Sequence, residues 1–112
     1  MNTRTIKIQG ENVKEIIKLL DGEVKSLTYQ PEENTYIFFS ERYYFRNNSQ
    51  LMACLILNFQ DESHCSIEIV TGGGSAGLAG TDLGAEGNRI KRINKDIDNI
   101  CSNKGWKMYS DD

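Results

Sequence analysis

A glycine-rich segment near the C-terminal end holds the residues whose types and spacing could do chemistry. Seven of the ten glycines lie between positions 72 and 87. Three of them, Gly72, Gly74 and Gly77, follow the spacing G-x-G-x-x-G after a predicted strand. Backbone N–H groups in such a segment can cradle a phosphate or another anion. The candidate anion ligands in it are Gly72, Gly73, Gly74, Ser75 and Gly77.

Charged side chains at the start of the helix predicted after this segment could complete an anion site. At 100° per residue, Arg89 and Arg92 flank the apolar stripe of that helix, and Glu86 opens it. One hypothesis is that Arg89, Arg92 and the loop N–H groups hold a small anionic ligand, with Glu86 and Asp82 lining the site. The alternative is a solvated helix face, which is the usual role of a run of charges.

The context of the glycines argues against a nucleotide site. A dinucleotide fold needs a parallel βαβ unit, for which too little chain follows, and Leu78 stands where a phosphate-binding loop needs lysine. Glycines also serve close backbone packing, a mobile lid or a loop with positive φ angles. Those explanations stay open beside anion binding, and the sequence leaves open whether residues 72–87 are loop or partly helical.

Thiols and the single histidine give no catalytic or metal-binding pattern. Cys54, Cys65 and Cys101 are widely spaced, so we expect three reduced, packed thiols. His64 adjoins Cys65, but neighbours on a strand point to opposite faces. We therefore predict no catalytic residues, no metal and no cofactor, and whether the chain is an enzyme stays open.

Composition bears on the partners. Tyr43 and Tyr44 beside Arg46 could stack single-stranded nucleic acid, but a net charge of -3 makes nucleic acid an unlikely partner. The most apolar run, Leu51 to Phe59, is too short to cross a membrane as a helix. We expect a cytoplasmic protein that does not enter a membrane.

Residue periodicity predicts one α+β domain over residues 1–112. Strands are expected at 3–9, 24–30, 36–39, 43–46, 51–60 and 64–71, with 36–46 forming either one bulged strand or two short ones. A helix should start at Asn12 through a capping box and stop at Gly22, and a second should span 86–104 and end at Gly105. The order β-α-β-β-β-β-α, with a closing strand or packed tail, favours an antiparallel sheet of about five strands with two helices on one face. A tight hairpin would set Phe59 opposite Cys65 and Cys54 near Val70.

The glycine-rich segment also carries a resemblance. Its Gly-Gly-Gly-Ser-Ala-Gly run, the later Gly84-Ala85-Glu86, the terminal helix and the aromatic residue after Gly105 make the chain similar to a family of small bacterial proteins of unknown function. The resemblance implies a fold and no reaction.

Taken together, these features favour a non-enzymatic binding or self-assembly module. The central strand is apolar on both faces, so a second copy could cover the sheet face that the helices leave open. The alternative is a small-molecule or phosphate-ligand binder, or an enzyme, that uses residues 72–87 and the start of the C-terminal helix.

Overall fold

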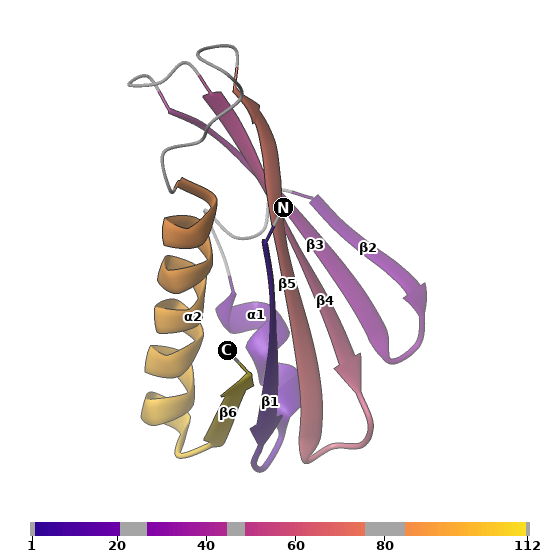
Figure 1. Ribbon diagram of the computed structural model, residues 1–112. Coiled ribbons are helices and arrows are strands. Elements are labelled where there is room, and N and C mark those ends of the chain that lie inside the picture. The colour runs from indigo at the N-terminus through magenta and orange to yellow at the C-terminus, as the bar shows by residue number, and fades with distance from the viewer. Residues whose placement is uncertain (1, 21–26, 45–48, 76–84, 112) are drawn as a thin grey trace.

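The computed structural model describes residues 2–20, 27–44, 49–75 and 85–111 (Figure 1). Six strands, one 3-10 turn and two α-helices occupy these ranges. In chain order they are β1 (Asn2–Gln9), η1 (Val13–Glu15), α1 (Ile16–Leu19), β2 (Leu27–Glu32), β3 (Thr35–Tyr44), β4 (Ser49–Phe59), β5 (His64–Ser75), α2 (Ala85–Lys104) and β6 (Lys107–Asp111).

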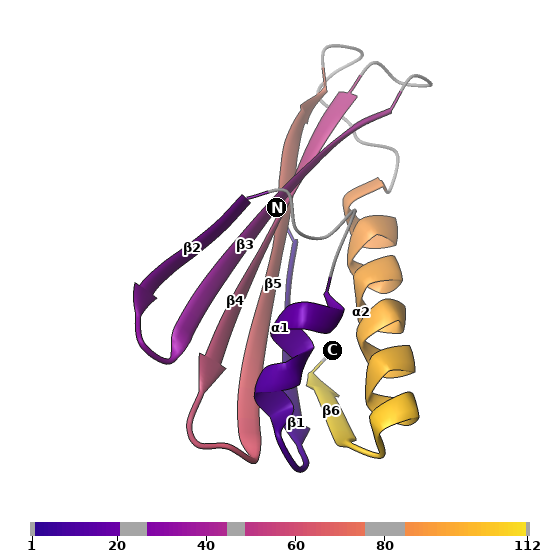
Figure 2. The same cartoon turned by 180° about the vertical axis from the view of Figure 1, so that it is seen from behind.

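All six strands form one antiparallel sheet in the order β2-β3-β4-β5-β1-β6. Strands β2 to β5 follow one another as hairpins, β1 pairs with the far side of β5, and β6 adds the edge beyond β1. Both helices lie on the same side of the sheet (Figures 1 and 2). The predicted α+β class and helix placement are confirmed. The sheet has one strand more than expected because the segment after Gly105 pairs with β1.

The core lies between the sheet and the helices. Along each strand, alternate side chains point inward, as the pleat requires. From the helix side, Ile90, Ile93 and Ile97 of α2 meet them. The strand residues that are 0% exposed are Ile6, Phe38, Ala53, Leu55, Leu57, Ile67, Ile69 and the polar Thr71.

The first helical segment starts differently from the prediction. Asn12 has a left-handed φ of 56° and its side chain makes no capping hydrogen bond, so the expected capping box is wrong. The N–H groups at this end have backbone acceptors instead. The Glu15 N–H, which the capping box would have served, donates to the Asn12 carbonyl at 3.0 Å, and the Val13 N–H donates to the Glu62 carbonyl at 3.1 Å.

Strands β2 and β3 also differ from the sequence prediction. The expected turn over Pro31 to Asn34 is confined to Glu33 and Asn34, and Pro31 lies in β2. The β2–β3 register shifts between Tyr29 and Glu32, which fits an edge strand that carries a proline without an N–H. Strand β3 is continuous and pairs with β4 without a shift, so the bulge belongs to β2. The predicted start of β2 at residue 24 and the helix stop at Gly22 lie outside the described residues.

The C-terminal third follows the prediction closely. Helix α2 spans Ala85–Lys104, one residue longer than expected, and Gly105 ends it with a φ of +75°. The Trp106 N–H then donates to the Cys101 carbonyl at 2.9 Å. The glycine-rich segment is in part strand, because β5 continues through Ser75. Residues 76–84 lie outside the described part of the chain.

Candidate functional site

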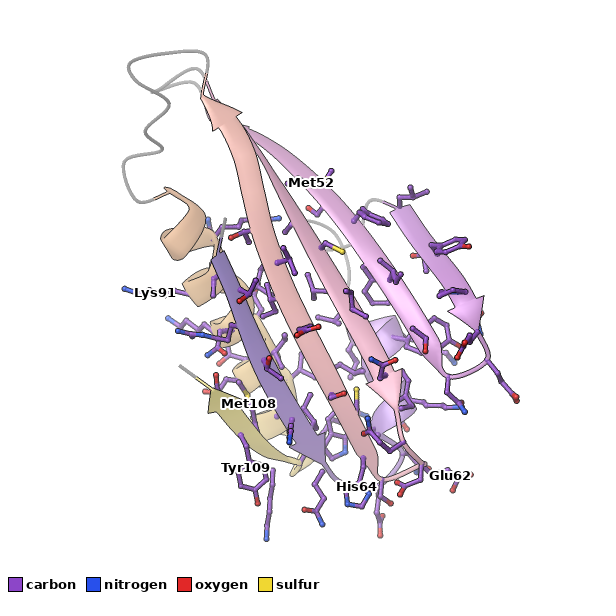
Figure 3. The ribbon with its side chains drawn as sticks, turned by 45° about the vertical axis from the view of Figure 1, so that its right-hand side comes forward. Met52, Glu62, His64, Lys91, Met108 and Tyr109 are labelled. Atoms are coloured by element: carbon purple, nitrogen blue, oxygen red, sulfur yellow. The ribbon has the colours of Figure 1, made fainter. Side chains whose placement is uncertain are left out.

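The face of the sheet opposite the helices carries the candidate site, and Figure 3 looks onto it. Its side chains are the strand residues that alternate with the core set. Phe38 and Leu55 are buried under the helices. Their sequence neighbours Phe39 and Cys54 therefore point to the opposite side of the sheet. In the part of the chain that the structure describes, neither helix packs over this face.

Eight apolar or aromatic side chains gather on this face across strands β2 to β5, and we call them the open-face patch. They are Leu27, Tyr29, Ile37, Phe39, Met52, Cys54, Ile56 and Val70. The patch is exposed most at its β2 edge and at its Met52 end: Leu27 is 63% exposed, Tyr29 58% and Met52 42%. Met52 is labelled in Figure 3.

Strand register makes the patch contiguous. Phe39 pairs with Leu27 on one side and with Cys54 on the other, and Cys54 pairs with Val70. A parallel row contains Tyr29, Ile37 and Ile56. Four strands spaced about 4.8 Å apart, over about six residues, give a planar area of about 400 Å². The patch takes up about two thirds of the outward positions in this area, or about 250 Å², and the remaining positions include Glu68 and Gly72. The largest apolar patches on monomeric proteins start at about this size and are often functional.

A third row of the open face is polar. It runs from Glu32 through Thr35, Asn58 and Ser66 to Lys7 and ends at Tyr109 of the edge strand β6. The Thr35 hydroxyl donates to the Asn58 side-chain oxygen at 2.9 Å. The row therefore has a carboxylate near its β2 end and an ammonium group near its β6 end. Beyond it, toward the sheet end at His64, residues including Lys7, Gln60 and Tyr109 line a hollow of about 590 Å³.

Four of the predicted anion ligands lie in a regular strand. Strand β5 pairs with β4 through this stretch, from Gly72 opposite Met52 to Ser75 opposite Ser49. The residues concerned are Gly72, Gly73, Gly74 and Ser75. The ladder with β4 uses part of the backbone hydrogen-bonding capacity that the anion hypothesis needs. Gly77 and Asp82 lie outside the described residues.

The structure separates the environments of the two arginines. Arg89 is only 2% exposed, and its Nη2 donates to the Ser40 hydroxyl oxygen at 2.9 Å. Arg92 is exposed, as the solvated-face alternative expected. Glu86 lies in the first turn of α2, and its side chain is not described. Arg89 therefore joins α2 to β3 inside the fold, a role that the helix pattern did not predict.

The thiols and the histidine do not form a reactive pair. Cys65 is 1% exposed, and burial, with a smaller contribution from Cys101, raises the pKa of its thiol to about 12. Burial likewise raises the pKa of Cys101 to about 11. His64 lies on the other side of the strand, exposed, with Nδ1 2.9 Å from the Asp61 carboxylate. Cys54 is the thiol that faces the open side of the sheet, and burial raises its pKa too.

The register predicted for the central hairpin is confirmed, since Phe59 pairs with Cys65 and Cys54 with Val70. Sequence reasoning found the two-sided apolar character of β4 but did not assign the contributions of β2, β3 and β5 to the open face. The signal was present, because Ile37 and Phe39 occupy one parity of β3 while Phe38 occupies the other.

No protein-family model, curated protein or solved structure matches this chain. Its resemblance to a family of small bacterial proteins therefore stays a prediction. Neither helix in the described ranges is long and apolar enough to cross a membrane. Within the same ranges, histidine, cysteine and acidic side chains form no group of three that could hold a metal ion.

Proposed function

We propose that the chain is a non-enzymatic binding or self-assembly module whose binding surface is the open-face patch. The observation that carries this proposal is a contiguous apolar surface on the side of the sheet that the helices leave open. The patch joins residues from four strands, and Phe39, Cys54 and Val70 form a row through its middle.

The energetics support an occupied surface. At about 25 cal/mol per Å², covering about 250 Å² of apolar surface is worth about 6 kcal/mol before the costs of association. The eight residues of the open-face patch carry no charge, but Glu68, which pairs with Ile56 and is exposed on the same face, lies directly beside them. A partner that covers the patch must therefore provide this carboxylate with a hydrogen-bond donor or leave it in contact with water. We further propose that the module acts in the cytoplasm, where free thiols such as Cys54 stay reduced.

The test is the size of the chain in undiluted extract of the cell that makes it, measured by size exclusion with immunodetection. The wild type should elute in a complex larger than its own 12.7 kDa. The variant Ile56→Lys should elute as the free chain, because it places a charge in the centre of the patch. Ile56 pairs with Glu68, so the introduced ammonium group gains a cross-strand partner and the fold is preserved.

Ser102→Lys is the matched control, because Ser102 is exposed on α2, on the other side of the sheet. It adds the same charge and should leave the complex intact. The open face is not the binding surface if the wild type elutes as a free chain. The same conclusion follows if each of the two single variants, Ile56→Lys and Ser102→Lys, loses the complex.

A further inference from the structure

The charges that border the open-face patch indicate which partner fits it. The polar row of the sheet places Glu32 on β2, two strands from β4 on one side, and Lys7 on β1, two strands from β4 on the other. Both side chains are exposed. A rotation of 180° about an axis along β4, lying in the plane of the face, exchanges these two positions.

From this symmetry we infer that the occupant of the open face is a second copy of the chain, packed sheet to sheet about a twofold axis along β4. Each Glu32 then lies near the partner's Lys7, and the partner's Glu32 lies near Lys7. The alternate residues Met52, Cys54 and Ile56 of β4 meet their own counterparts on the axis. The inference rests on the proposed function and adds the partner and its orientation.

The flanking strands are also compatible with this arrangement. The rotation lays β3 over the partner's β5, so that Phe39 meets the partner's Val70. It lays Tyr29 over the partner's Thr5 and Ile37 over the partner's Glu68. The Tyr29 hydroxyl is then one strand away from that carboxylate and is a hydrogen-bond donor for it. Aligned sheets cross at about 30°, so the axis is inclined to β4 by about 15°. The pairs far from the axis are therefore neighbours and not strict register partners, and the long side chains of glutamate and lysine bridge the offset.

The apolar patch alone is too small for a stable dimer interface, so the polar row must contribute to the contact. The apolar patch of about 250 Å² is about a third of the 800 Å² per partner that a standard stable interface buries. Covering the polar row as well brings the contact toward that size, and only a partner with complementary charges can cover it without penalty. A copy of the same face, turned about β4, supplies those charges.

Cross-linking of Cys54 tests the axis directly in the purified full-length chain. A short bis-maleimide should join two copies through Cys54, because the two thiols face each other across the axis, whereas Cys65 and Cys101 are buried. Cys54→Ala should abolish the product. Adding Thr5→Cys to that variant should not restore it, because Thr5 lies two strands from the axis on β1, about 19 Å from its counterpart.

Charge exchange tests the orientation. Lys7→Glu and Glu32→Lys should each weaken dimerisation about tenfold, measured by sedimentation equilibrium, since each places like charges together at two symmetric sites. The double variant should restore the wild-type affinity. A dimer that does not cross-link at Cys54, or a double variant no tighter than the single ones, would overturn this arrangement in favour of another, such as pairing of β2 edges. A strictly monomeric purified chain would also overturn it. The extract experiment would still decide whether the face binds a different protein, so the two proposals fail separately.

Discussion

The contact between Gly10 and Trp106 allows a stability prediction with a magnitude. A Cβ atom at Gly10 would lie 2.1 Å from Cδ1 and 2.7 Å from Cγ of Trp106, far inside van der Waals contact. The indole is 8% exposed and its Nε1–H donates to the Glu11 carbonyl at 2.8 Å. Gly10→Ala must therefore displace the ring. Overpacking costs about 1–3 kcal/mol and the lost hydrogen bond about 1 kcal/mol, so the free energy of unfolding should fall by about 2–4 kcal/mol.

Urea unfolding with tryptophan fluorescence measures this effect, because Trp106 is the single tryptophan of the chain. Gly105→Ala is the matched control. It meets no atom within 4 Å but must hold a φ of +75°, which costs about 1 kcal/mol and leaves the ring in place. The emission maximum of the folded state should shift in Gly10→Ala and not in Gly105→Ala. Equal losses of stability with unchanged emission would refute the argument from crowding. The same loss for Gly10→Ala in a Trp106→Leu background would also refute it; that background has no tryptophan, so its unfolding is followed by circular dichroism.

Three further predictions concern polar and titrating groups. Ser40→Ala removes the acceptor of the buried Arg89 hydrogen bond and should lower the free energy of unfolding by about 1.5–3 kcal/mol in urea titrations; no change would show that this bond contributes nothing. The hydrogen bond and charge of Lys104 hold the pKa of Glu15 below its usual 4.5, so its contribution to stability is present above that pH and is lost as the pH falls through the lower folded value. As the pH falls from about 5 to about 3, the melting temperature should therefore decline less for Glu15→Gln than for the wild type. Equal declines in melting temperature would contradict this. The Cys65 thiol, with a pKa of about 12, should carry about a thousandfold less thiolate at neutral pH than an ordinary thiol and should react with a disulfide reagent only after unfolding; equal rates in the folded and unfolded chain would argue against its burial.

Most local structure could be predicted because it depends on neighbours in the sequence. Alternation identified β1 and β5, a run of residues that is apolar on both faces identified β4, and the apolar stripe of α2 gave that helix to within one residue. The tight turn after Gln60 determined the β4–β5 register, since the length of a hairpin loop sets which residues face each other. Gly105 ended the helix where a left-handed residue was needed.

The errors occurred where distant segments decide the local conformation. Asn12 takes a left-handed backbone and its side chain caps nothing, while the Val13 N–H beside it donates to Glu62 in the distant turn between β4 and β5. Gly72 and the residues after it became strand because β4 offers a long ladder to pair with, although glycine alone favours no strand. Arg89 was predicted to line a site or face solvent, yet its guanidinium reaches Ser40, forty-nine positions earlier in the chain.

For the candidate surface too, the sequence determined one part and the tertiary structure the other. The sequence alone determined that β3 and β4 are apolar at both parities, and hence that both faces of the sheet centre would be apolar. Only the tertiary structure decided which face the helices cover, because period-2 alternation distinguishes two sides without ordering them. Strand order, too, is a non-local property: it placed Glu32 and Lys7 on opposite flanks of β4, and the proposed dimer rests on that placement.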